Sequence, residues 1–184
     1  KVMNLVRSFL LCALGLCTAM RGFAAENPSS TKSDWQEFVS VLGGYKVAFP
    51  GYPQHVSEKV GVKDSGQAIR YDAYIAQNGI DTLFMVLIAT YPKENVRGSA
   101  EDGLKGFLKG ILSQSAESKL GYIDMHSFQG FSAMDFLIET AGVYLKGKAV
   151  MVDNVLYLIA MEGHFSHFQQ DEYSQFVESF KLLK

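Results

Sequence analysis

The dipeptide Asn78-Gly79 constrains the fold of this chain more than any other feature. It stands between two runs of alternating residues, 69–77 and 80–88, and Asn and Gly tolerate the positive φ that a type I′ hairpin turn requires. We therefore predict a hairpin with Gln77 opposite Ile80. The second run is apolar on both faces, which predicts a central strand with a helix over its other face. The predicted pairs on the apolar face are Ile75 with Thr82, Ala73 with Phe84, Tyr71 with Val86, and Ile69 with Ile88.

The first 24 residues have the three-part pattern of a secretory signal peptide. Lys1 and Arg7 precede an apolar run over 8–20, and Gly22-Phe23-Ala24 places small residues before a cleavage site. A helix of about 13 residues is roughly 20 Å long, short of the ~30 Å hydrocarbon core of a bilayer. We expect cleavage near Ala24. Lipidation at Cys17 and retention as a membrane anchor are the alternative interpretations.

Cleavage would leave a polar tether at 25–33 and one domain at 34–184. The signal contains both cysteines, Cys12 and Cys17, so the exported chain would offer no thiol for a disulfide or a zinc site. The whole sequence has 17 Lys and Arg against 19 Asp and Glu, and like charges do not gather in blocks. This balance argues against nucleic acid as a partner.

Helical spacing and turn residues predict the elements of the domain. Ser99 and Asp102 form a capping box before a second helix, and a last helix precedes the end of the chain. Strands are predicted over 119–128, 131–141, about 143–152 and 155–162, with two-residue turns at Gln129-Gly130 and Asp153-Asn154. A short first helix is predicted from the spacing of Trp35, Phe38, Val39 and Leu42.

One face of the predicted hairpin over 119–141 contains the candidate binding residues. The Gln129-Gly130 turn places Asp124 opposite Asp135, next to His126 on the same face. Two like charges in this position favour a bound cation or a raised carboxyl pKa, or else a solvated face on which His126 moderates the repulsion. The candidate binding residues are Tyr122, Asp124, His126, Phe128, Phe131, Asp135 and Leu137.

A second group of candidate ligands is His164-x-x-His167, flanked by Glu162, Asp171 and Glu172. The same spacing is typical of the approach to a helix, with Phe165 and Phe168 packing inward, so we assign no metal and no cofactor. The sequence also lacks a nucleophile elbow, a Walker loop and a zinc-protease motif. The sequence therefore contains no motif of these kinds on which an enzyme could be predicted.

The segment YKVAFPGYP at 45–53 runs from a predicted strand into Phe-Pro-Gly-x-Pro, and FVESFKL at 176–182 ends the last predicted helix in Phe-x-x-Ser-Phe. In these two motifs the chain resembles the PsbP-like and DcrB-like superfamily, in which they bracket the domain. The resemblance covers essentially all of 34–184. It implies an α+β fold, with an antiparallel sheet of about six or seven strands and helices packed on its face. Members of the superfamily mostly bind, scaffold or chaperone other molecules.

The expected function is an exported, non-enzymatic binding or assembly module of the bacterial cell envelope, in the periplasm or at the envelope, with a protein partner. Membrane association is expected only through the signal or a lipid at Cys17. The first alternative is a carrier of a small ligand or metal ion, with a pocket between the sheet and the helix near 100–115. The second is a hydrolase, which needs a nucleophile beside His55, His126, His164 or His167.

Overall fold

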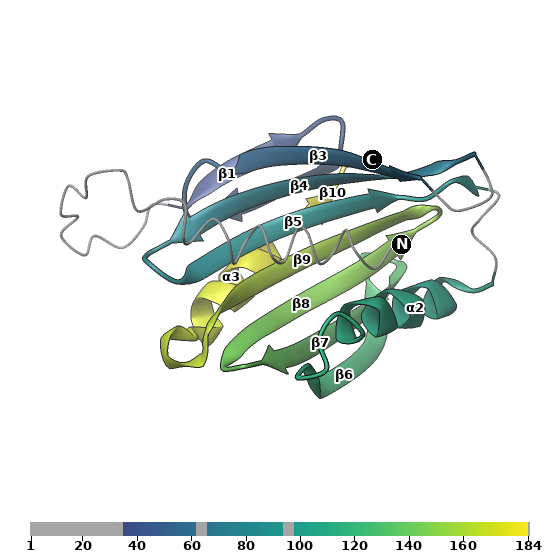
Figure 1. Ribbon diagram of the computed structural model, residues 1–184. Helices are drawn as coiled ribbons and strands as arrows, with labels where there is room; N and C mark the ends of the chain where they lie inside the picture. Colours follow the sequence, from purple (N-terminus) through teal and green to yellow (C-terminus); the bar gives the residue numbers. More distant parts are fainter. Residues whose placement is uncertain (1–34, 62–65, 94–97, 184) are drawn as a thin grey trace.

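The computed structural model describes residues 35–61, 66–93 and 98–183, and Figure 1 shows their arrangement. The predicted signal peptide and polar tether lie outside the described residues. A seven-stranded antiparallel sheet has the order β3-β4-β5-β9-β8-β7-β6, and a second sheet has the order β1-β2-β10. The strands are β1 (Gln36–Ser40), β2 (Tyr45–Phe49), β3 (Gln54–Gly61), β4 (Ala68–Asn78), β5 (Thr82–Thr90), β6 (Lys119–Phe128), β7 (Phe131–Thr140), β8 (Val143–Val152), β9 (Val155–His164) and β10 (Lys181–Leu182).

The two faces of the large sheet are covered by different elements. Helix α2 (Ala100–Leu112) packs on β7 and β8 on one face. Helix α3 (Gln170–Ser179) packs on β9 and on the small sheet at the other face, following the short 3-10 helix η2 (Phe165–His167). In Figure 1, α2 lies in front of the sheet and α3 behind it. The predicted α+β architecture is confirmed, with the seven strands of the large sheet inside the predicted range.

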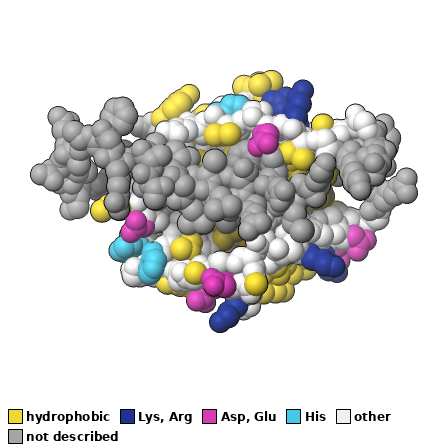
Figure 2. All heavy atoms as spheres, viewed as in Figure 1, with side chains coloured by type: hydrophobic (Ala, Val, Ile, Leu, Met, Phe, Trp, Pro, Cys, Tyr) yellow, Lys and Arg dark blue, Asp and Glu magenta, His cyan; other side chains and the backbone are white. Residues whose placement is uncertain are grey.

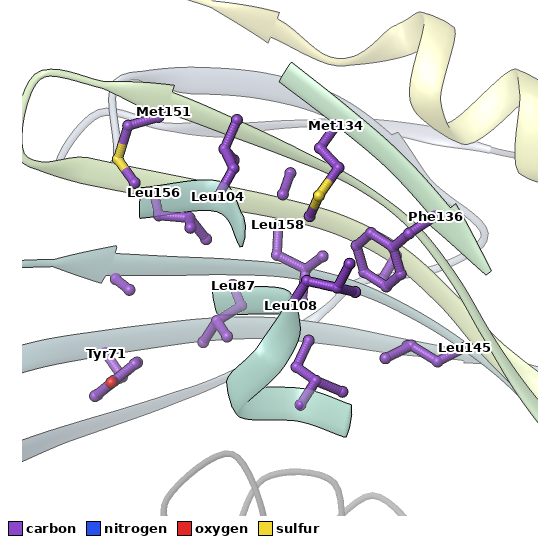
Figure 3. Packing of buried hydrophobic residues seen from close by; sticks show 14 of the residues in the cluster. Tyr71, Leu87, Leu104, Leu108, Met134, Phe136, Leu145, Met151, Leu156 and Leu158 are labelled. Carbon is purple, nitrogen blue, oxygen red and sulfur yellow. The ribbon is translucent and has the colours of Figure 1, made fainter. Parts of the chain in front are cut away.

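Helix α2 begins where the capping box predicts. Ser99 accepts a hydrogen bond from the backbone N–H of Asp102, and the Asp102 carboxylate accepts one from the backbone N–H of Ser99. The apolar stripe of the helix enters the first core cluster, and Figure 3 shows Leu104 and Leu108 against side chains from β8 and β9. The labelled partners from these strands are Leu145, Met151, Leu156 and Leu158.

The predicted strands from residue 119 onward and their turns are confirmed. Gln129 and Gly130 have φ of 51° and 87°, as the type I′ turn requires, and they join β6 to β7 with Phe128 opposite Phe131. A similar two-residue turn at Ala141-Gly142 joins β7 to β8. Four consecutive strands therefore form a meander that fixes the register of β6 to β9.

The predicted first helix is wrong, because residues 36–40 form strand β1. This strand pairs with β2, with Phe38 opposite Val47. The centres of the Phe38 and Phe49 rings lie 5.9 Å apart. Val39 and Leu42, which the helical pattern placed in the core, are exposed by 48% and 93%. A helix of two turns has little stability by itself in water, whereas the open edge of β2 offers backbone partners to a strand.

The predicted register of the Asn78-Gly79 hairpin is also wrong. Asn78 lies opposite Thr82, so the turn contains three residues, 79–81, and Gly79 provides the positive φ of 67°. The pairing shifts by three positions, an odd number, and Ala73 therefore lies opposite Leu87 instead of Phe84. The central position of β5, between β4 and β9, agrees with the prediction.

Candidate functional site

The hairpin of β6 and β7 places the candidate residues as predicted. Asp124 lies opposite Asp135, His126 opposite Ala133, and Tyr122 opposite Leu137. Their side chains lie on the face of the large sheet that also carries α3. The residues differ in exposure. Asp124 projects into solvent with 74% of its side chain exposed, whereas Asp135 and His126 are about a quarter exposed. The predicted face therefore exists, with its polar groups at different depths.

Lys148 on β8 lies at the centre of this face, where sequence reasoning had placed no residue. It is opposite Asp135 across the β7–β8 ladder, and its ammonium group lies 2.7 Å and 2.9 Å from the two Asp135 carboxylate oxygens. The lysine is 7% exposed, and its Nζ lies 5.0 Å from the centre of the Phe128 ring. A cation belonging to the chain thus compensates the inner carboxylate.

His126 completes a polar network with these two residues. Its Nε2 lies 2.7 Å from Lys148 Nζ and 3.6 Å from Asp135 Oδ2. Because an ammonium group has no lone pair, Nε2 must be the acceptor, which places the imidazole hydrogen on Nδ1. Asp124 Oδ2 lies 4.0 Å from Nδ1, beyond hydrogen-bond distance, and the buried Nδ1 makes no hydrogen bond to the described residues. The imidazole is therefore held on its Lys148 side.

This network changes the interpretation of the two opposed carboxylates. The cation-binding hypothesis required negative charge without compensation, but the Lys148 ammonium occupies the space between Asp135 and His126. Among residues 35–61, 66–93 and 98–183, three or more His, Cys, Asp or Glu side chains are nowhere grouped to hold a metal ion. The face is better described as a paired acid–base network with aromatic neighbours.

A second lysine on the same strand extends the face toward α3. Lys146 Nζ lies over the rings of Tyr173, Phe168 and Tyr122, at 4.7, 5.2 and 5.8 Å from their centres. It donates a hydrogen bond of 2.7 Å to Gln170 Oε1. Burial lowers the pKa of Lys146, and burial raises the pKa of Tyr173. The cation–π contacts fix the lysine stem and hold the aromatic rings in place.

The register across the Ala141-Gly142 turn was the signal that would have found both lysines. Pairing Thr140 with Val143 puts Leu137 opposite Lys146 and Asp135 opposite Lys148. The turn residues are visible in the sequence, but the strands on its two sides were not paired with each other. Alternation along β8 then places both lysines on one face, two residues apart.

Replacing Lys148 by methionine is expected to lower the free energy of unfolding by about 2 kcal/mol. Methionine keeps most of the stem that packs on Phe128 but leaves Asp135 without its cation. Urea denaturation of wild type and variant measures the change. The double variant Lys148→Met/Asp135→Asn is expected to be more stable than the single one, and exposed Lys109→Met should behave as wild type. Additive losses in the double variant would contradict the coupling.

The second histidine group lies elsewhere, at the turn after β9. His167 Nδ1 is 3.2 Å from Asp81 Oδ2, and His164 Nδ1 is 3.1 Å from the Ser166 hydroxyl. A serine therefore lies beside a histidine, as a hydrolase requires, but the carboxylate contacts the other histidine. The helix-approach interpretation fits Phe168, whose ring centre lies 5.0 Å from that of Tyr144. The Phe165 ring also lies against Tyr144, with ring centres 5.5 Å apart, but Phe165 is 40% exposed.

Glu162 on β9, one of the acidic residues that flank the His164-x-x-His167 pair in the sequence, is a buried carboxyl group. It is 7% exposed and lies opposite Leu83 on β5 and Leu145 on β8. Burial raises its pKa to about 7. Its neighbours are core strands on both sides, and the group therefore titrates near neutral pH inside the sheet.

The space proposed for a carrier pocket, between α2 and the sheet, contains closely packed side chains. Gly103 shows how close they are, because a Cβ there would come within 2.7 Å of the Met151 methyl group. A cleft of about 300 Å³ lies instead at another place, beside the Ala141-Gly142 turn. It is lined by Glu117, Lys119, Glu139, Ala141 and Gly142.

The fold and the site together define a class of protein: an α+β sandwich whose large antiparallel sheet displays a paired polar network with aromatic neighbours on one face. Figure 2, viewed from the same side as Figure 1, shows the molecule from the α2 side, where the basic and acidic side chains are scattered among apolar ones. In the part of the chain that the structure describes, no helix is both long and apolar enough to cross a membrane.

Comparison with solved structures gives this class a more definite fold. The chain is similar to the cyanobacterial PsbP protein CyanoP from Synechocystis, with a TM-score of 0.56, 13% identity, and coverage of 86% of this chain and 98% of that one. A protein of unknown function from Pseudomonas aeruginosa matches with a TM-score of 0.38, 8% identity, and coverage of 72% and 84%. No protein-family model and no curated protein matches the sequence. The fold is therefore PsbP-like, and the likeness extends to the fold alone.

Proposed function

We propose that this protein is an exported, non-enzymatic binding or assembly module of a bacterial cell envelope. Its partner is a protein that binds one sheet face beside its acidic residues, the face bearing Tyr122, Phe128, Phe131 and Leu137. The N-terminal pattern supports export, and the segments that resemble PsbP-like and DcrB-like proteins support an envelope role within that superfamily. In this proposal the described domain acts outside the cytoplasm, and the membrane is contacted only through the signal or a lipid at Cys17.

The observation that carries the proposal is the incomplete cover of this face. Helix α3 packs on β9 and β2, and the β6–β7 hairpin extends beyond it. Tyr122 and Phe131 are consequently exposed by 38% and 37%, at opposite ends of the paired strands. Aromatic side chains that are partly exposed and held by neighbours contribute disproportionately to protein interfaces.

The polar network supports binding more than catalysis. Lys148 and Asp135 are paired with each other, and His126 accepts from the lysine. Such mutual pairing holds the side chains in one arrangement before a partner arrives, which reduces the entropy lost on binding. Asp124, at the exposed margin, adds a charge that a partner can recognise and that orients its approach.

The decisive experiment compares partner capture by the wild type and by Phe131→Asp/Leu137→Asp. Chemical crosslinking and pull-down from the native envelope are expected to recover a specific protein with wild type. Recovery should fall at least tenfold with the variant, because two apolar contacts become charged. The matched control is Ile80→Asp, an 83% exposed residue in the β4–β5 turn, which should capture the partner as wild type does. Equal recovery by all three proteins, or a co-purifying small molecule in place of a protein, would refute the proposal.

A further inference from the structure

Strand β6 ends the large sheet, and its outer edge is the subject of a second proposal. The strand order places β6 beside β7 alone among the described strands, and its residues from Lys119 to Asp124 are all exposed. An edge strand presents backbone N–H and C=O groups that another strand can pair with. Three apolar side chains of this segment, Leu120, Tyr122 and Ile123, are exposed by 42%, 38% and 41%.

A bulge in β6 changes which side chains share a face. Leu120 lies opposite Ile138 and Tyr122 opposite Leu137, so Gly121 is an extra residue. As a result Leu120 and Ile123, three positions apart, lie opposite β7 residues that are two positions apart. They therefore share one face, and their backbone groups point to the same side of the strand.

The charged residues at the two ends of the segment share the other face of β6, because they too lie opposite β7 residues an even number of positions apart. Lys119 lies opposite Glu139 and Asp124 opposite Asp135, four positions apart on β7. Both side chains therefore project from the face that carries Tyr122. A cation at one end and an anion at the other end of a short exposed segment make that segment complementary to itself in the antiparallel direction.

We propose that β6 pairs antiparallel with β6 of a second copy of this chain, about a two-fold axis between Gly121 and Tyr122. In this register Lys119 lies opposite the partner's Asp124 and Leu120 opposite the partner's Ile123. Gly121 lies opposite the partner's Tyr122, whose ring covers the glycine. Each contact occurs twice, as an isologous interface requires, and the two large sheets become continuous.

Only this register satisfies the faces over the whole exposed segment. A register centred between Tyr122 and Ile123 sets Tyr122 opposite the partner's Ile123, although these two side chains project from different faces. A register centred on Asp124 sets two like charges opposite each other, which is unfavourable. A register centred on Met125 sets Asp124 opposite the partner's His126, but Lys148 already holds that imidazole. The bulge, often a device against edge pairing, here creates the self-complementary pattern.

Charge reversal tests the pairing in the full chain, with sedimentation velocity over a concentration series. Wild type is expected to form a dimer. Lys119→Asp sets two carboxylates opposite each other across the interface, and Asp124→Lys sets two ammonium groups opposite each other. Each variant should therefore weaken dimerisation at least tenfold, or by about 1.4 kcal/mol. The double variant Lys119→Asp/Asp124→Lys restores opposite charges and should restore the dimer.

The outcomes separate this proposal from the proposed function. Phe131→Asp alone, at the far end of the hairpin from the two-fold axis, should weaken capture of the envelope partner and is expected to dimerise as wild type does. A monomeric wild type at every concentration would overturn the self-pairing and leave the edge to an extended segment of another protein. A dimer that Lys119→Asp does not weaken, or that the double variant fails to restore, would overturn the register. Unchanged circular dichroism spectra show that each variant is folded.

Discussion

Replacement of Phe176 by alanine is expected to lower the free energy of unfolding by about 4 kcal/mol and the melting temperature by about 10 °C. Phe176 is fully buried between α3 and the sheets, and its ring centre lies 5.2 Å from the ring centres of both Phe49 and Phe84. Alanine at this position leaves a cavity that links three elements far apart in the sequence.

The only tryptophan reports directly on this cavity. The Trp35 ring centre lies 6.3 Å from that of Phe176 and 5.1 Å from that of Phe84. Because the cavity lies beside the indole ring, the tryptophan emission is expected to shift to the red in folded Phe176→Ala. Phe165→Ala provides the control, because Phe165 is 40% exposed and lies in the turn after β9. It should cost much less stability and leave the tryptophan spectrum unchanged. Equal losses in the two variants would show that α3 does not anchor the core.

The second large effect is a loss of stability between about pH 4.5 and pH 7, caused by Glu162. Burial raises the pKa of this carboxyl group from 4.5 to about 7 in the folded chain. Above pH 4.5 the unfolded chain ionises while the folded chain keeps its proton, so rising pH favours unfolding. The cost reaches about 3 kcal/mol once the pH exceeds 7, and it is absent below pH 4.5.

Glu162→Gln isolates this contribution, because glutamine has the same shape and does not ionise. The variant is expected to match wild type near pH 4.5 and to be more stable by about 3 kcal/mol at pH 8, as measured by urea denaturation across this range. Glu178→Gln, an exposed glutamate on α3, should follow the wild-type curve. Parallel curves for wild type and Glu162→Gln would mean that the carboxyl is hydrated in the folded state.

Local signals in the sequence were sufficient for a large part of the fold. The capping box of Ser99 and Asp102 defined the start of α2, and the turn Gln129-Gly130 defined the register of β6 and β7 next to it. In both cases the relevant contacts lie within a few residues of each other along the chain. The candidate face bearing Asp124, His126 and Asp135 followed directly from that register.

Two errors show where local signals end. The residues around Phe38 have helical spacing, yet they form a strand, because the neighbouring strand β2 provides backbone partners and Tyr74, distant in sequence, packs against the Phe38 ring. The Asn78-Gly79 dipeptide predicted a turn correctly, but its length depends on how β4 and β5 fit against β9 and β3. A turn longer by one residue moves the pairing and exchanges the faces of one strand relative to the other.

The sequence by itself determined the α+β class, the second helix, the four-strand meander from Lys119 onward, and the face on which Asp124 and Asp135 meet. These features depend on period, capping and turn residues, which act over short stretches of chain. Only the tertiary structure decided that β1 is a strand and that Glu162 is buried. Phe38 of β1 packs against Tyr74 of β4, and Glu162 lies between β5 and β8. These environments form only when strands far apart in sequence pack together, and no local pattern encodes the solvent exclusion that results.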